Sequence, residues 1–72
     1  MTDAKLLEAA IAVSGLSDRR FAVYIMGRNE RTIRGWKSGG PMYPVVRDWL
    51  EAWLAIPDHR RRLIVDSFTE PR

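Results

Sequence analysis

The sequence contains no cysteine, which removes two ways of stabilising a chain of only 72 residues. A disulfide framework and a cysteine-based zinc site both require thiols. The lone histidine, His59, has no second histidine or cysteine with which to share a metal. We therefore expect no cofactor, and a single domain over residues 1–72 whose hydrophobic core is barely sufficient for its size.

Long apolar runs are also missing. No stretch approaches the roughly 20 residues that a transmembrane helix requires. The first residues are not strongly basic, and Glu8 interrupts the apolar segment that follows, so the start does not resemble a signal peptide. We expect a soluble chain that does not contact a membrane, and the lack of cysteine fits a reducing cytoplasm.

Groups that could perform catalysis are few. Asp48 and Glu51 lie near each other on one predicted helix face, but they lack a nucleophile, a metal cluster or a phosphate-cradling loop. A domain this small also leaves little room for a pocket. We therefore expect no enzymatic activity and no small-molecule ligand.

Positive charge is what the chain has in excess, and it is concentrated in the middle. The net charge is +3 overall, but residues 17–47 carry seven basic and two acidic side chains, and the segments on either side are each slightly acidic. A basic centre is typical of a protein that binds a polyanion. Chance clustering of arginines on a solvated surface would give the same pattern.

Helical signals cover nearly the whole chain, which is 46% hydrophobic. Ser17 and Asn29 are good N-caps, and Gly15 and Gly27 are good helix stops. Together with the apolar spacing, they predict an all-α fold, a compact bundle of five short helices. The predicted ranges are 3–14, 18–26, 30–37, 44–55 and 57–68.

The second and third of these helices are joined by a tight glycine turn, which is the arrangement of a helix-turn-helix. The segment FAVYIMGRNERTIRGWKSGG, residues 21–40, resembles the helix-turn-helix of Cro and CI-type phage repressors, the XRE family. The resemblance covers roughly residues 16–55. The positions that carry it are Phe21-Ala22, Gly27, Thr32-Ile33, Trp36 and Gly39.

One feature departs from the family, because the spacing from Ala22 to Gly27 is one residue longer than in the commonest form. This leaves open whether Ala22 or Val23 makes the close contact between helices. Size and organisation also resemble small autoregulators of phage operons, including anti-CRISPR-associated repressors. The resemblance implies a transcriptional regulator, a repressor that binds an inverted-repeat operator in double-stranded DNA as a homodimer, in the cytoplasm of a bacterial or phage-infected cell.

The resemblance also implies which side chains meet DNA. The base-reading set is Asn29, Glu30, Arg31 and Arg34. Arginine can pair with guanine, asparagine with adenine and glutamate with cytosine, although Glu30 could instead orient a neighbouring arginine or serve only the helix dipole. Contacts to the DNA backbone are expected from Arg19, Arg20, Arg28, Thr32, Lys37, Ser38 and Tyr43.

Gly35 is an unusual choice inside this recognition helix, because glycine costs about 0.5–1 kcal/mol relative to alanine there. It would permit a close approach to DNA or to Trp49 of the next helix. Alternatively, it simply lies near the helix end, where the cost is small.

The C-terminal half is expected to form the dimer interface, since a domain of this size would not bury both Trp49 and Trp53. The expected interface residues are Trp53, Leu63, Ile64 and Phe68. A monomer with a fully internal apolar stripe is the alternative, and the arginine run at 60–62 is expected to be a solvated face. The rival interpretation of the whole chain is a protein-interaction module or antitoxin built on the same bundle.

Overall fold

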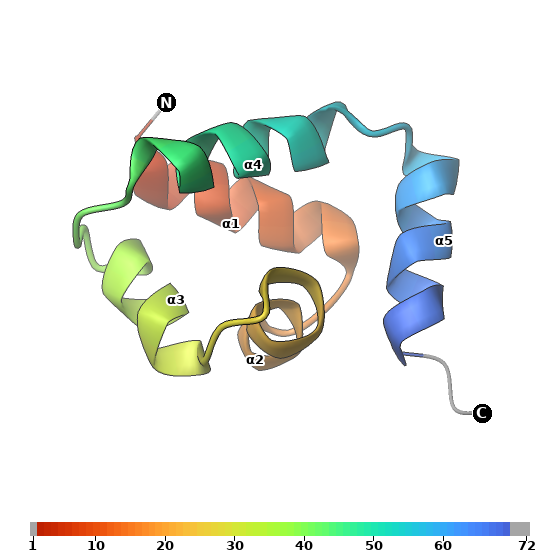
Figure 1. The fold of residues 1–72 in the computed structure, drawn as a ribbon, viewed down its shortest axis with the longest axis horizontal. Helices are drawn as coiled ribbons and strands as arrows, with labels where there is room; N and C mark the ends of the chain where they lie inside the picture. The colour runs from red at the N-terminus through yellow and green to blue at the C-terminus, as the bar shows by residue number, and fades with distance from the viewer. Residues whose placement is uncertain (1, 70–72) are drawn as a thin grey trace.

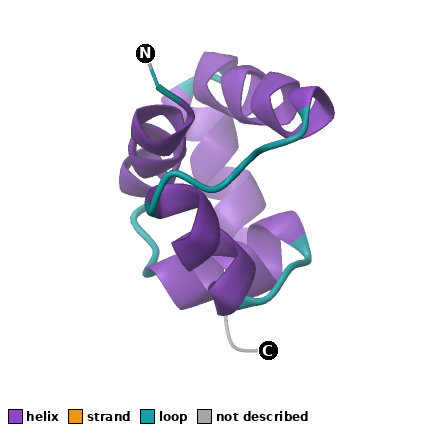
Figure 2. Ribbon diagram, turned by 90° about the vertical axis from the view of Figure 1, so that its left-hand side faces the viewer, coloured by secondary structure: helices purple, strands orange, loops and turns teal. Residues whose placement is uncertain are grey.

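The computed structural model describes residues 2–69, and over this range the chain is an all-α bundle without strands (Figures 1 and 2). Its elements are α1 (Asp3–Ser14), α2 (Asp18–Arg20), the π-helix η1 (Phe21–Met26), α3 (Glu30–Lys37), α4 (Pro44–Ala55) and α5 (Asp58–Thr69). Because η1 continues directly from α2, the described chain has five helical segments, which confirms the predicted fold class. No helix in this range has both the length and the apolar character needed to cross a bilayer.

The helix ends fall where the capping residues predict them. The Ser17 hydroxyl accepts a hydrogen bond from the backbone N–H of Arg20 at 3.2 Å, at the start of α2. Gly15 and Gly27 end α1 and η1 with φ angles of +73° and +66°, a conformation that glycine adopts without steric cost. The helix ends are therefore set by residues close to them in the sequence.

The core lies where α1, α3 and α4 meet, and η1 closes it. α1 packs beside α4 and against α3 (Figure 1). One large side chain from each of the four elements is fully buried: Leu7, Phe21, Ile33 and Leu50. The apolar spacing of each helix thus converges on one cluster, which fixes the orientation of α3 from behind.

The chain between Ala22 and Gly27 belongs to the π-helix η1. The backbone N–H of Gly27 bonds to the carbonyl of Ala22, five residues back instead of four, so the helix is wider at this point. Ala22 is fully buried and Val23 is exposed. The side chain inside the bundle is therefore that of Ala22, which settles the alternative that the sequence left open.

The two C-terminal tryptophans have different environments. Trp53 is 3% exposed, and its indole N–H donates a hydrogen bond to the carbonyl of Ala10 at 3.1 Å. Trp49 stacks on Trp53 at 5.7 Å between ring centroids and remains 38% exposed. Phe21 meets both rings edge-on. Trp53 is thus a core residue, and only a small edge of it could contribute to the expected dimer interface.

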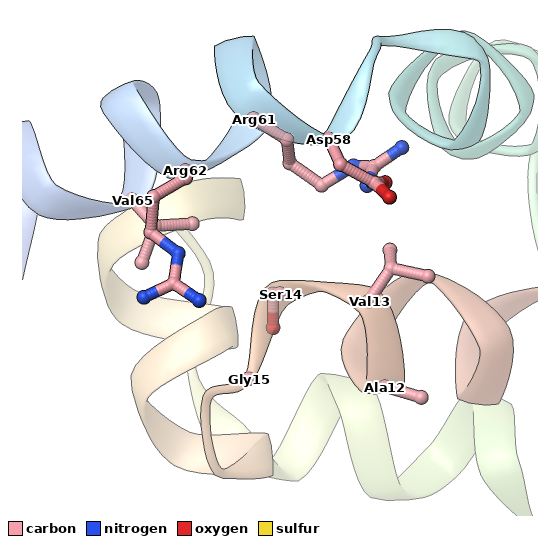
Figure 3. A pocket seen from close by; sticks show the side chains of 8 residues that line it. All are labelled: Ala12, Val13, Ser14, Gly15, Asp58, Arg61, Arg62 and Val65. Atoms are coloured by element: carbon pink, nitrogen blue, oxygen red, sulfur yellow. The ribbon is translucent and has the colours of Figure 1, made fainter.

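The arginine run is not wholly a solvated face, because Arg61 is only 4% exposed. Its guanidinium donates to the carbonyls of Trp53, Leu54 and Ile56 at the end of α4, and forms an ion pair of 2.7 Å with Asp58. Figure 3 shows Arg61 and Arg62 leaving α5 in different directions around a hollow of about 380 Å³ between α1 and α5. Arg61 therefore caps α4 and anchors α5 to it.

Candidate nucleic-acid interface

The short helix α3 has one buried face and one exposed face. Ile33 and Trp36 are buried against the bundle. On a helix of 3.6 residues per turn, the direction opposite to these two anchors is shared by four residues. They are Arg31, Arg34, Gly35 and Ser38, all exposed, and we call them the outer strip of α3.

Asn29 has a structural role at the start of this helix. Its side-chain oxygen accepts hydrogen bonds from the backbone N–H of Thr32 at 2.9 Å and from the Thr32 hydroxyl at 3.1 Å. A paired contact to adenine requires that same oxygen as well as the amide N–H group. Both Asn29 and Thr32, expected to contact DNA, are thus engaged in capping α3.

Glu30 lies beside Arg34 and forms an ion pair of 3.1 Å with it, one helical turn apart. The Arg34 side chain is still 70% exposed, so its guanidinium can hydrogen-bond a further group. An exposed pair of this kind adds little stability. The contact instead restricts the directions in which the Arg34 side chain can extend. Orienting a neighbouring arginine is one of the roles expected for Glu30.

Arg31 differs from Arg34, the other cation of the outer strip, because it has no ion-pair partner in the described part of the chain. It is exposed and forms no ion pair within residues 2–69. An arginine without an internal partner keeps all five of its N–H donors for another molecule. Arg31 is therefore the side chain of α3 best placed for an external acceptor.

Lys37 connects α3 to α2. Its Nζ atom lies 2.9 Å from the carboxylate of Asp18, and this hydrogen bond raises the pKa of Lys37. Lys37 was expected to contact the DNA backbone, but here it fixes the start of α2 against the end of α3. The sequence gives no sign of this pair, because the two residues are 19 positions apart.

Three further arginines flank α3 without ion-pair partners among the described residues. Arg28 lies over the ring of Trp36, with 5.6 Å between the guanidinium carbon and the ring centroid. Arg19 and Arg20 are exposed and line a shallow hollow of about 440 Å³ with Ser17, Val23 and Tyr24. Asp18 joins α2 to α3 through Lys37, so the helix that carries Arg19 and Arg20 lies beside α3.

The loop after α3 contributes two of the other expected backbone contacts. Ser38 ends the helix and is exposed, and Tyr43 is exposed immediately before α4. Both residues are thus exposed, Ser38 at the C-terminal end of α3 and Tyr43 at the start of α4. Most of the predicted interface residues lie between Arg28 and Ser38, on α3 or beside its ends, and Asn29, Thr32 and Lys37 also hold that helix in place.

The glycines at the end of α3 have different surroundings. A Cβ atom built on Gly35 would have no neighbour within 4 Å, so Trp49 does not approach this position. A Cβ on Gly40 would lie 2.7 Å from the carbonyl oxygen of Gly35, which accepts a hydrogen bond from the Gly40 N–H. Internal packing therefore accounts for Gly40 but not for Gly35.

The expected dimer residues other than Trp53 lie on α5. Ile64 and Phe68 line an apolar hollow of about 370 Å³ between η1, α4 and α5, whose other lining residues are Ile25, Trp49, Ala52, Trp53 and Ile56. Phe68 is 55% exposed. Leu63 is also exposed but does not line this hollow. Of the predicted set, Ile64, Phe68 and the buried Trp53 line the hollow, whereas Leu63 lies on a separate surface.

Comparison of the chain with protein-family models, curated proteins and solved structures gives no match.

Proposed function

We propose that the chain is a sequence-specific double-stranded DNA-binding protein, in which α2 with η1 and α3 form a helix-turn-helix of the XRE type. The observation that carries this proposal is the outer strip of α3. It presents Arg31 and Arg34 to solvent while Ile33 and Trp36 hold the helix from behind. A helix fixed in this way can enter the major groove, where arginine makes paired hydrogen bonds to guanine.

The roles within this interface follow from the contacts of each side chain. Arg31 and Arg34 read bases, and Glu30 directs Arg34 through their ion pair. Asn29 and Thr32 cap the helix, and the side-chain amide N–H groups of Asn29 are left for a nearby phosphate, whereas the Thr32 hydroxyl already donates to Asn29. The DNA backbone is contacted chiefly by exposed groups of the neighbouring segments: Arg19, Arg20, Arg28 and Tyr43.

As a regulator, the protein would act by occupying a promoter and excluding polymerase. Operators of this kind are inverted repeats read by two-fold dimers, with half-sites about 34 Å or multiples of it apart. The exposed apolar hollow beside Phe68 supports self-association. This role requires neither a cofactor nor catalysis. The protein would act in the cytoplasm of a bacterial or phage-infected cell, as an autorepressor of its own operon.

A fluorescence-anisotropy titration tests the base-reading assignment, using duplexes selected by the parent protein from a randomised pool. We expect Arg31→Ala and Arg34→Ala each to weaken binding to the selected duplex about 10–100-fold, since a paired guanine contact is worth about 1–3 kcal/mol. Arg62→Ala, which removes an exposed arginine on α5, is the matched control and should bind like the parent. Parent-like binding by both α3 variants would contradict the assignment.

The second candidate function is a protein-interaction module or antitoxin, and the apolar hollow between η1, α4 and α5 is the observation that favours it. Salt dependence separates the two functions. DNA binding through about six phosphates should weaken roughly a thousandfold between 50 and 200 mM salt. Binding of a protein in an apolar hollow should change little over the same range.

A further inference from the structure

Gly35 is a glycine for which the chain itself provides no reason. Glycine is favoured where φ is positive or where another part of the chain approaches the backbone closely. Among the described residues, positive φ occurs at Gly15, Gly27 and Gly39 but not at Gly35. A side chain at Gly35 would meet nothing within 4 Å. Both internal explanations are thus excluded by the geometry.

The position within α3 does not remove the cost of this glycine. Trp36 and Lys37 continue the helix after it, and Ser38 is the cap. The site is exposed, so alanine, lysine or glutamate would strengthen the helix there. A residue that weakens an exposed helix without an internal benefit points to an external surface that needs the space.

The neighbours of Gly35 indicate what that surface is. Arg31 lies one turn before Gly35 and Ser38 three residues after it, on the same outer strip. Arg34 lies at the adjacent position, held by Glu30 at 3.1 Å. The bare backbone of Gly35 is thus surrounded by hydrogen-bond donors that suit the edges of bases and the phosphates beside them.

We infer that Gly35 marks the point at which α3 comes closest to the DNA, with Arg31 and Ser38 reaching base edges on either side of it. This inference rests on the proposed DNA-binding function. In the usual arrangement, only the N-terminal residues of the recognition helix contact the bases. Here the middle and the C-terminal end of α3 would also lie against the floor of the groove. Gly35 then determines how deeply the helix inserts, and Ser38 reads a base instead of a phosphate.

Substituting Gly35 by alanine and by leucine tests this inference, because both are strong helix formers but differ in size. We expect both variants to raise the Tm by about 2–6 °C, since neither side chain is obstructed within the chain. Affinity for the selected duplex should fall in order of size, about tenfold for Gly35→Ala and about a hundredfold or more for Gly35→Leu. Gly40→Ala, whose Cβ would meet the Gly35 carbonyl, is the stability control and should lower the Tm.

The possible results separate this inference from the function on which it rests. Parent-like affinity of Gly35→Leu would overturn it, because the groove would then have room for a large side chain. Equal losses for alanine and leucine would also overturn it, because they would indicate helix stiffening and not steric exclusion. If the parent protein itself does not distinguish selected from scrambled duplexes, the proposed DNA-binding function fails, and the inference fails with it.

Discussion

At the scale of single residues, identical side chains in adjacent positions have different roles. Arg61 is buried, and its guanidinium bonds three carbonyls at the end of α4. These carbonyls lie at the end of the helix, where the regular backbone hydrogen bonds stop, and within the described chain only that of Trp53 also accepts one from the backbone, from the N–H of Ile56 at 3.3 Å. Arg60 and Arg62 are exposed. The guanidinium of Arg61 thus stabilises the contact between α4 and α5, whereas those of Arg60 and Arg62 are exposed to solvent.

We expect Arg61→Ala to lower the free energy of unfolding by about 2 kcal/mol or more, because each buried carbonyl left without a donor costs about 1–3 kcal/mol. Arg62→Ala should change it by less than about 0.5 kcal/mol, as is usual for exposed positions. Urea denaturation followed by circular dichroism measures both. Equal effects of the two substitutions would show that Arg61 does not cap α4.

At the scale of elements, exposed ion pairs join helices that are distant in sequence. Lys37 joins α3 to α2, and Arg47 joins α4 to α1 through Asp3, at 2.8 and 3.2 Å. The hydrogen bond from Arg47 holds the pKa of Asp3 below its ordinary value. These contacts adjust how the helices are oriented, while the buried apolar side chains supply the main stabilisation.

The Asp3–Arg47 pair predicts a specific dependence of stability on pH. A carboxylate whose pKa is lowered in the folded state stabilises the fold above its ordinary pKa, and this contribution is lost as the pH falls below about 4. We therefore expect Asp3→Asn to have a lower Tm than the parent at pH 7 and a smaller deficit at pH 3. Thermal melts from pH 2 to 7 measure this difference.

Arg47→Gln removes the other partner and provides a check on the same contact. It should show the same convergence with the parent at low pH, because the protonated Asp3 no longer gains from the arginine. A deficit for either variant that stays constant down to pH 2 would contradict a role for this ion pair in acid stability.

At the scale of the whole molecule, the candidate DNA-binding surface and the apolar hollow are separated. α3 and α5 lie at opposite ends of the longest dimension, which is 36 Å (Figure 1). A dimer joined at the α5 end would therefore hold its two α3 helices further apart than a dimer joined along α4. The spacing of the half-sites in a DNA footprint would report which surface is used.

Self-association should depend on the hollow beside Phe68. We expect the parent to sediment as a dimer and Phe68→Glu to weaken dimerisation at least about tenfold, because the hollow would receive a charge. Leu63→Glu is the control, since Leu63 is exposed but does not line the hollow. Analytical ultracentrifugation distinguishes the variants. A monomeric parent at high concentration, or an equal loss for Leu63→Glu, would contradict this interface.

Much of the fold was predictable because its signals are local. Ser17, Asn29 and the positive-φ glycines act within one turn of the chain, and they set the helix ends at the predicted positions. The anchors Ile33 and Trp36 were identified from their spacing, because three residues along a helix bring side chains to the same face. The direction of the outer strip of α3 follows from the same geometry.

Only the tertiary structure decided which charges are free and which tryptophan is covered. Lys37 meets Asp18, Arg47 meets Asp3 and Trp53 meets Ala10 across many residues of sequence, and composition cannot specify such distant pairs. Likewise, Arg61 is the one of three consecutive arginines that is buried, because it is placed where its guanidinium can donate to the carbonyls at the end of α4. Local backbone geometry determined the helices, whereas long-range packing determined which side chains remain available to another molecule.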